Sequence, residues 1–476
     1  MKLGKVLGLS AALCLGALPL AAQETNNVEQ LKKQLQELQQ KFQKQQAEQR
    51  QQIEALQKQL EALLLQQHKP EQAAATNQSS DPAPAVPFPS PPADQPWSPS
   101  QPIALGRAGS AYMNVSFDAL ADVGWSTASD PAARLQLGDH DPIQRGFSLR
   151  NAEIALDGAV DPYFKGFANI VFKLDKDQST EVELEETYLQ SVALPANLQL
   201  KAGQFFANFG RQNPQHPHTW AFVDEPLILS RAFGPDGLRN IGGQLSWLLP
   251  TPFYTEVFLG VLNGQGGTAF SFRNPEADGN HGRTPIDRGL RGAGDLLYVP
   301  RIASSFDLTD QQTLVVGASA AFGPNDSGAH SRTEVYGVDA YWKWKSAHAN
   351  QGFPFVSWQT EALYERFGAG ENVSAGLPAE NLRDWGFYSQ LLWGLKPRWV
   401  AGLRGEFVSG NDGAFDASDI FRGDRTRVSP NLTWYPSEFS KIRLQYNYDH
   451  GELFGAEHSV WMQVEFLLGS HAAHKF

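Results

Sequence analysis

Two segments near the end of the chain alternate apolar and polar residues with a period of two. In 442–449 the even positions are Ile, Leu, Tyr and Tyr, and the odd positions are Arg, Gln, Asn and Asp. Segment 460–468 has the same apolar alternation, with Gln463 and Glu465 on the opposite face. Successive side chains of a β-strand point to opposite faces, so each segment predicts a strand with one apolar and one polar face. Such strands before a terminal Phe476 are typical of the closing hairpin of a transmembrane β-barrel.

Segments with strand character recur along the chain from residue 110. We predict sixteen strands, over 110–125, 146–160, 162–174, 181–193, 197–205, 239–249, 252–262, 300–308, 312–322, 332–345, 353–367, 383–394, 397–409, 424–435, 440–449 and 458–468. The expected fold class is therefore all-β: a sixteen-stranded antiparallel transmembrane β-barrel over 103–476, preceded by an N-terminal α-helical coiled coil. Pro430 conflicts with the fourteenth strand, because proline cannot donate a ladder hydrogen bond.

The connections between these strands alternate between short and long. Short turns include 161–162, 194–197, 250–252 and 436–438, whereas 206–238, 263–299, 368–382 and 409–423 are long and rich in Gly, Asp and Asn. Bacterial outer-membrane barrels have short periplasmic turns and longer external loops. A soluble β-sandwich or propeller gives no reason for this alternation. The pattern therefore favours the membrane barrel, with both of its ends on the periplasmic side.

The N-terminal region predicts three further segments. Residues 1–22 are typical of a secretory signal peptide, with Lys2 and Lys5 ahead of an apolar core. Residues 23–69 carry a glutamine-rich helix whose apolar positions follow 3–4 spacing, which favours a self-associating periplasmic coiled coil. Residues 70–102 contain ten prolines and predict an extended linker between the coiled coil and the barrel.

Composition and motifs restrict the class of function. The chain has a formal net charge of −12, which argues against nucleic acid as a partner. The single cysteine, Cys14, lies in the expected signal peptide, so the mature chain has no thiol chemistry. The sequence has neither a Gly-x-Ser-x-Gly nucleophile elbow nor a P-loop. We therefore expect no enzyme activity and no cofactor.

Two histidine pairs and one basic run remain as further candidates. His216-x-His218 and His471-x-x-His474 offer two metal ligands each. Without a third ligand both pairs are expected to be solvated loop residues, so no metal site is predicted. The basic run 283–291 (RTPIDRGLR) lies in an expected external loop. A solvated face, a patch facing the lumen and a contact to lipopolysaccharide are all compatible with it.

Two segments resemble the phosphate-selective porin O and P family. Residues 147–158 (FSLRNAEIALDG) resemble its Arg-containing second strand followed by an acidic-Gly turn. Residues 187–205 (TYLQSVALPANLQLKAGQF) resemble its strand–turn–strand ending in Gly-Gln-Phe, after which a long loop folds into the pore. The resemblance covers 110–476. It implies a sixteen-stranded barrel, a homotrimer and passive diffusion through a constriction lined by inward-folded loops and basic residues.

The candidate pore-lining residues come from the long loop after residue 205 and from strand positions that face the lumen. They are Arg211, Arg231, Arg239, Lys201, Arg404, Arg443, Glu183 and Glu406. A phosphate-selective constriction needs a surplus of positive charge. Residues 103–476 instead hold 30 Lys and Arg against 42 Asp and Glu. The sequence therefore predicts weak charge selectivity, and the phosphate selectivity of the family does not transfer.

These observations favour an outer-membrane porin of a Gram-negative-type bacterium. It would pass small hydrophilic solutes or ions, anions such as phosphate among them. The expected partners are outer-membrane lipid, lipopolysaccharide and further copies of the same chain in a homotrimer. The alternative is an envelope-structural protein, in which the coiled coil tethers the outer membrane to peptidoglycan or a periplasmic partner and the barrel is only an anchor.

Overall fold

The computed structural model describes residues 102–469, except 110, 136–137, 193, 276–279 and 416–418. The expected signal peptide and coiled coil, most of the linker, the His471-x-x-His474 pair and Phe476 lie outside the described residues. No helix within the described range is long and apolar enough to cross a membrane.

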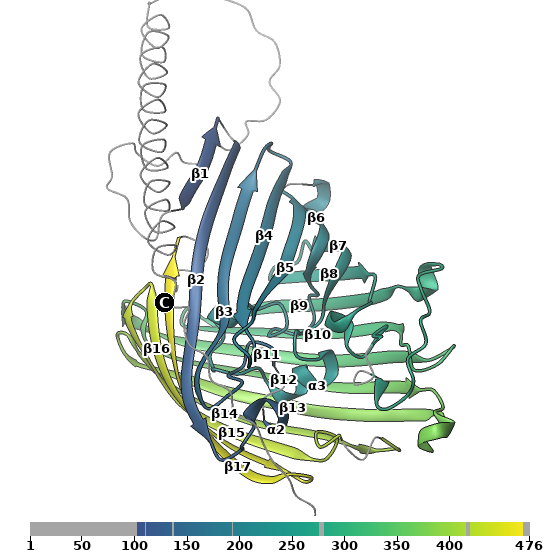
Figure 1. Ribbon diagram of the computed structural model, residues 1–476. Helices are drawn as coiled ribbons and strands as arrows, with labels where there is room; N and C mark the ends of the chain where they lie inside the picture. Colours follow the sequence, from purple (N-terminus) through teal and green to yellow (C-terminus); the bar gives the residue numbers. More distant parts are fainter. Residues whose placement is uncertain are drawn as a thin grey trace, which may run out of the picture. The chain divides into compact units, whose positions relative to one another are not determined.

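Sixteen antiparallel strands, β2 to β17, form a closed barrel (Figure 1). Each strand pairs with the next along the chain, and β17 closes the ring by pairing with β2. Their bounds are β2 Ala111–Ser126, β3 Gly146–Ala159, β4 Phe164–Leu174, β5 Thr180–Ser191, β6 Leu198–Phe206, β7 Arg239–Leu248, β8 Tyr254–Leu262, β9 Leu297–Thr309, β10 Gln312–Pro324, β11 Arg332–Asn350, β12 Phe353–Ala369, β13 Glu380–Lys396, β14 Trp399–Asp412, β15 Arg425–Ser437, β16 Ser440–Gly451 and β17 Gly455–Leu468. The sixteen-stranded barrel is confirmed, and every expected strand overlaps an observed one.

A short additional strand, β1 (Ile103–Ala108), lies beside the N-terminal end of β2. The sequence pattern does not predict it. The last pair between β17 and β2 joins Leu468 to Phe117. The pairing of β1 with β2 begins immediately beyond it, where Ile103 lies opposite Val115. The edge of β2 that a longer β17 would need is therefore occupied by β1. This arrangement accounts for the end of the apolar alternation at Leu468.

The barrel wall has its apolar face outside and its polar face inside. In β16, Leu444 is 53% exposed, whereas Arg443 is 1% exposed and Gln445 is fully buried. The same alternation runs through β12 to β17. A water-soluble protein of this size keeps its apolar side chains inside and its charged ones outside. The reversed pattern is that of a barrel whose outer surface meets lipid.

Pro430 is accommodated within β15, on the outer face of the wall. On one side it pairs with Leu403 of β14. On the other side the β15–β16 ladder joins Val428 to Tyr448 and resumes at Asn431 and Gln445, without pairs at the two positions between. The missing proline donor therefore interrupts one ladder locally, and the strand continues in the same register.

Loops of unequal length connect the strands, as the sequence predicts. The longest connections are 207–238 and 263–296, whereas β9–β10, β11–β12, β13–β14 and β15–β16 have tight turns. The basic run 283–291 is not simply a solvated face. Arg283 is 1% exposed and donates hydrogen bonds to the backbone carbonyls of Gly370, Pro378 and Ala414. Arg283 therefore ties its own loop to the loop between β12 and β13 and to the loop between β14 and β15.

Candidate functional site

The long connection 207–238, called here the inserted loop, folds into the lumen of the barrel. It contains a short 3-10 turn, η2 (Pro217–Thr219), and one helix, α3 (Leu227–Phe233), which lies against β12, β13 and β14 (Figure 1). Every residue of α3 is buried. Apolar side chains of the loop, such as Phe209 and Phe233 with ring centroids 4.8 Å apart, pack with inward-facing residues of the wall. The barrel therefore has an apolar core, which lies inside its lumen.

Asp224 fixes the middle of the inserted loop to one side of the wall. Its carboxylate forms ion pairs with Arg404 of β14 and with Arg427 of β15, the latter at 2.8 Å. It also accepts hydrogen bonds from the side-chain amides of Gln445 (2.8 Å) and Asn447 (2.7 Å) on β16. Burial acts to raise the pKa of Asp224, but Arg404 and Arg427 outweigh it and hold the pKa below its ordinary value. This carboxyl group therefore stays ionised and joins four wall residues.

A second acid on the same side holds the start of α3. Glu406 accepts a hydrogen bond from the backbone N–H of Leu227 at 2.7 Å and pairs with Arg404 at 2.7 Å. The first N–H groups of a helix lack partners within the helix, so an acidic side chain at this end is stabilising. Wall and loop are thus joined at adjacent points by one cluster of ion pairs and hydrogen bonds.

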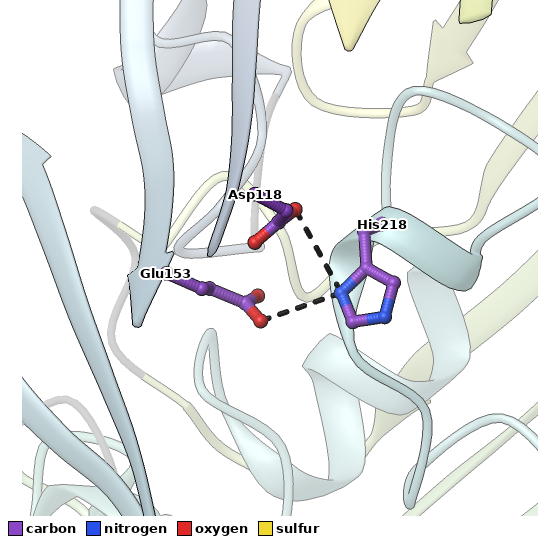
Figure 2. Close-up of side chains that lie close together, drawn as sticks. All are labelled: Asp118, Glu153 and His218. Carbon is purple, nitrogen blue, oxygen red and sulfur yellow. Dashed lines mark ion pairs between the residues drawn. The ribbon is translucent and has the colours of Figure 1, made fainter. Parts of the chain in front are cut away.

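A second part of the wall, which β17 separates from β16, holds the loop through histidines. His216 contacts Glu185 with Nδ1 at 2.8 Å and Glu186 with Nε2 at 3.0 Å, both on β5. Its ring stacks on that of His218, with centroids 5.8 Å apart. His218 in turn points at Asp118 of β2 and Glu153 of β3 (Figure 2). Both histidines are buried, so the expectation that they are solvated is wrong.

A cavity of about 350 Å³ lies between the inserted loop and the inner face of β11, β12 and β13. Its lining is Arg211, Gln215, Thr219 and Ala221 of the loop with Tyr341, Ser357, Gln359, Gln390 and Leu392 of the wall. Arg211 is the only charged side chain among them. Its guanidinium lies 3.9 Å from the ring centroid of Tyr341 and donates a hydrogen bond from Nε to Gln359 at 3.0 Å. The cavity is therefore polar, with one fixed positive charge.

Of the eight predicted pore-lining residues, only Arg211 lines this cavity. Four of the others anchor the inserted loop or its ends: Arg404 and Glu406 as described above, Arg443 by donating to the Trp220 carbonyl, and Arg231 through Asp384 at 3.5 Å. Glu183 and Arg239 form an ion pair with each other, and Lys201 lies over the ring of Tyr188 at 4.4 Å. Most of the candidate charged residues therefore contact other residues of the protein and do not line this cavity.

Sequence reasoning missed Asp224 as an anchor and the uncharged cavity wall. In the sequence, Asp224 is one of several acidic residues of the loop, and nothing distinguishes it from the others. Its role depends on Arg404 and Arg427 lying at matching depth on adjacent strands, which requires the register of β14 and β15. Tyr341, Ser357 and Gln390 occupy inward positions of ordinary strands, where polar uncharged residues give no distinct sequence signal.

Comparisons with known proteins agree with the architecture. No protein-family model matches the chain. An uncharacterized protein of Aquifex aeolicus (strain VF5) is 30% identical over 354 residues, which is 70% of this chain and 71% of that protein. Among solved structures, the outer membrane channel DcaP of Acinetobacter baumannii has a TM-score of 0.50 and 13% identity, over 76% of this chain and 99% of that one. An anion-selective porin from Comamonas acidovorans has a TM-score of 0.49 and 6% identity, over 75% of this chain and all (100%) of its own.

Proposed function

The chain belongs to the same family as the uncharacterized Aquifex aeolicus protein, and we propose that it is an outer-membrane porin through which small hydrophilic solutes and ions diffuse passively. The observation that carries this proposal is the reversed barrel wall. Its apolar outer face suits lipid, and its polar inner face suits water and hydrophilic solutes. The similarity to the DcaP fold is consistent with this proposal.

The inserted loop supports a passage of restricted size. It is fixed to β14–β16 through Asp224 and Glu406 and to β2–β5 through its histidines. Because the loop is fixed at two regions of the wall, the free space beside it is set by the protein and not by random motion of the loop. The cavity at Arg211 is the part of the described lumen that we assign to the passage.

Charge selectivity in this proposal is weak, with a slight preference for anions. Most charged lumen residues named above are paired with opposite charges, so they cancel locally and do not present an open field to a permeating ion. Arg211 remains at the cavity and gives the preference its sign. Phosphate passes as one of several small anions, without a site that distinguishes it, so the proposal does not extend to phosphate-selective transport.

Planar-bilayer recording of the refolded mature chain tests this function. We expect stepwise conductance in KCl and a small reversal potential of anion-preferring sign across a salt gradient. Circular dichroism of the same sample controls for the barrel. A β-rich, membrane-inserted sample that never conducts contradicts the proposal.

The proposal includes the sequence-based domain order: a signal peptide over 1–22, a periplasmic coiled coil over 23–69 and a linker over 70–102. It also includes a homotrimer, for which the coiled coil supplies one means of association. Deleting residues 23–102 distinguishes the two hypotheses, a porin and an envelope tether. A porin keeps its unit conductance after this deletion, whereas a tether loses its envelope phenotype while its barrel still inserts.

A further inference from the structure

We propose that Asp118, Glu153 and His218 form a binding site for a divalent transition-metal cation, with Zn²⁺ as the probe. The three side chains come from β2, β3 and the inserted loop and point toward one another (Figure 2). One ligand atom from each lies within 4.8 Å of the other two. Nδ1 of His218 is 3.3 Å from Oε2 of Glu153 and 3.8 Å from Oδ2 of Asp118.

The donor set fits such a cation in geometry and in charge. Zn²⁺ binds imidazole nitrogen and carboxylate oxygen at about 2.0–2.2 Å, so tetrahedral ligands lie roughly 3.3–3.5 Å apart. The 3.3 Å between His218 and Glu153 matches this value, and the 3.8 Å between His218 and Asp118 is slightly longer. Two carboxylates and one neutral imidazole balance the charge of a dication. The combination of nitrogen and oxygen donors favours zinc or a similar first-row metal over calcium or magnesium.

An independent observation at Asp118 points to a ligand at this position. Asp118 is 2% exposed, and neither of its carboxylate oxygens has a hydrogen-bond partner. A buried carboxylate without donors is costly, and Glu153 beside it carries a charge of the same sign. A bound cation removes both problems at once, because it supplies the missing partner and separates the two carboxylates electrostatically.

The surroundings hold the other two ligands in place. Glu153 accepts hydrogen bonds from the side-chain amides of Asn151 (2.8 Å) and Asn169 (3.2 Å), which fix its carboxylate. Lys441 donates a hydrogen bond to the backbone carbonyl of His218 at 2.8 Å, and its charge is paired with Glu465. Supporting hydrogen bonds of this kind orient metal ligands and raise metal affinity.

The neighbouring histidine, His216, is held by acids of a different strand. Both nitrogens of His216 contact carboxylates, those of Glu185 and Glu186. That ring is therefore already held by β5. A cation at His218 adds a direct link from the inserted loop to β2 and β3, so its binding should restrain the loop in the lumen.

Isothermal titration tests the site on the complete mature chain in detergent. The protein carries no affinity tag, is first treated with EDTA, and has His471→Gln and His474→Gln to remove the histidine pair near its end. We expect one Zn²⁺ per chain and a rise in the thermal unfolding midpoint with Zn²⁺. Asp118→Asn and His218→Gln should each weaken binding at least about 100-fold. His450→Gln, at an exposed strand position, is the matched control and should bind as the parent does.

A measurement on the parent protein alone guards against variants that fail to fold. Co²⁺ in place of Zn²⁺ should give an intense visible spectrum of low coordination number with nitrogen and oxygen ligands, which Zn²⁺ then abolishes by displacement. A spectrum of free aqueous Co²⁺ from a folded β-rich sample overturns the proposal. So does undiminished Zn²⁺ binding by a folded Asp118→Asn variant. These readouts need no conductance, so they are independent of the proposed porin function.

Discussion

The inserted loop meets two walls of opposite chemistry. The basic wall, on β14–β16, is formed by Arg404, Arg425, Arg427 and Arg443, and the loop offers it the carboxylate of Asp224. The acidic wall, on β2, β3 and β5, is formed by Asp118, Glu153, Glu185 and Glu186, and the loop offers it His216 and His218. The loop is thus complementary in charge to the wall on each side.

The difference lies in how permanent the charges are. Arginine stays protonated at all ordinary pH values, so the contact of Asp224 with the basic wall depends only on the carboxyl group. A histidine loses its charge when the pH rises through its pKa. Burial acts to lower the pKa of His216, but Glu185 and Glu186 outweigh it and raise the pKa well above its ordinary value, so this contact with the acidic wall weakens only at alkaline pH. We therefore expect the basic wall to hold the loop at all ordinary pH values. The contact with the acidic wall is the one that changes with pH.

The largest effect is expected from Asp224→Asn. This change removes the counter-charge that the buried Arg404 and Arg427 share, although Arg404 keeps Glu406 and Arg427 keeps Asp449. Removing one partner of a buried ion pair costs about 3–5 kcal/mol. Denaturant unfolding of the barrel in detergent measures the loss. Asp177→Asn, at an exposed turn, is the control and should be neutral. Equal stability of the Asp224 variant and the parent would show that the basic wall does not hold the loop.

A smaller loss is expected from Glu185→Gln on the acidic wall. The carboxylate accepts from Asn169 at 2.6 Å and contacts His216 at 2.8 Å. The amide keeps the shape but not the charge, and we expect a loss of about 1–3 kcal/mol. Unfolding is followed as for Asp224→Asn. A loss as large as that of Asp224→Asn would remove the distinction between the two walls.

The pH dependence of stability also distinguishes the acidic wall from the basic wall. His140, in the loop between β2 and β3, lies 3.4 Å from Glu185. Burial acts to lower the pKa of His140, but Glu185 and Asp139 outweigh it and raise the pKa from 6.5 to about 9. The stabilising charge is thus fully present below pH 6.5 and is lost as the pH rises from 6.5 to about 9.

His140→Gln should therefore reduce the change of the unfolding midpoint between pH 7 and 9. Asp141 does not obscure this window. Burial and the nearby Asp224 raise the pKa of Asp141 from 3.8 to about 7, so its unfavourable ionisation develops mainly below the window. A parent protein whose midpoint is already constant from pH 7 to 9 contradicts this account of the acidic wall.

The smallest effect on stability is expected from Arg211→Gln. Arg211 is half-buried at the cavity, and no ion pair to an acid is found for it among the described residues. Its loss should leave the unfolding midpoint within about 0.5 kcal/mol of the parent value. The reversal potential across a salt gradient should move toward zero or toward cation preference. An unchanged reversal potential would place the passage elsewhere in the lumen.

The sequence predicted the barrel and its reversed faces well, because the period of two fixes the face of each residue once a strand is recognised. Arg443 and Leu444 illustrate this directly. The candidate site was harder to predict from the sequence than the barrel. Whether Arg404 lines a passage or holds Asp224 depends on where an irregular loop places its side chains, and no periodic pattern encodes that. The burial of His216 and His218 was not predicted, because their acidic partners lie on strands distant in sequence.

In the proposed porin, solutes pass beside the inserted loop at the cavity near Arg211. Cys14, the only cysteine, lies in the expected signal peptide, so a mature chain with Ser357→Cys carries a single thiol in the cavity wall. Reaction of this thiol with a charged methanethiosulfonate during planar-bilayer recording should lower the unit conductance. Val338→Cys, on the outer face, should show no change. Complete labelling of Ser357→Cys, verified by mass, with undiminished conductance would show that solutes do not pass through this cavity.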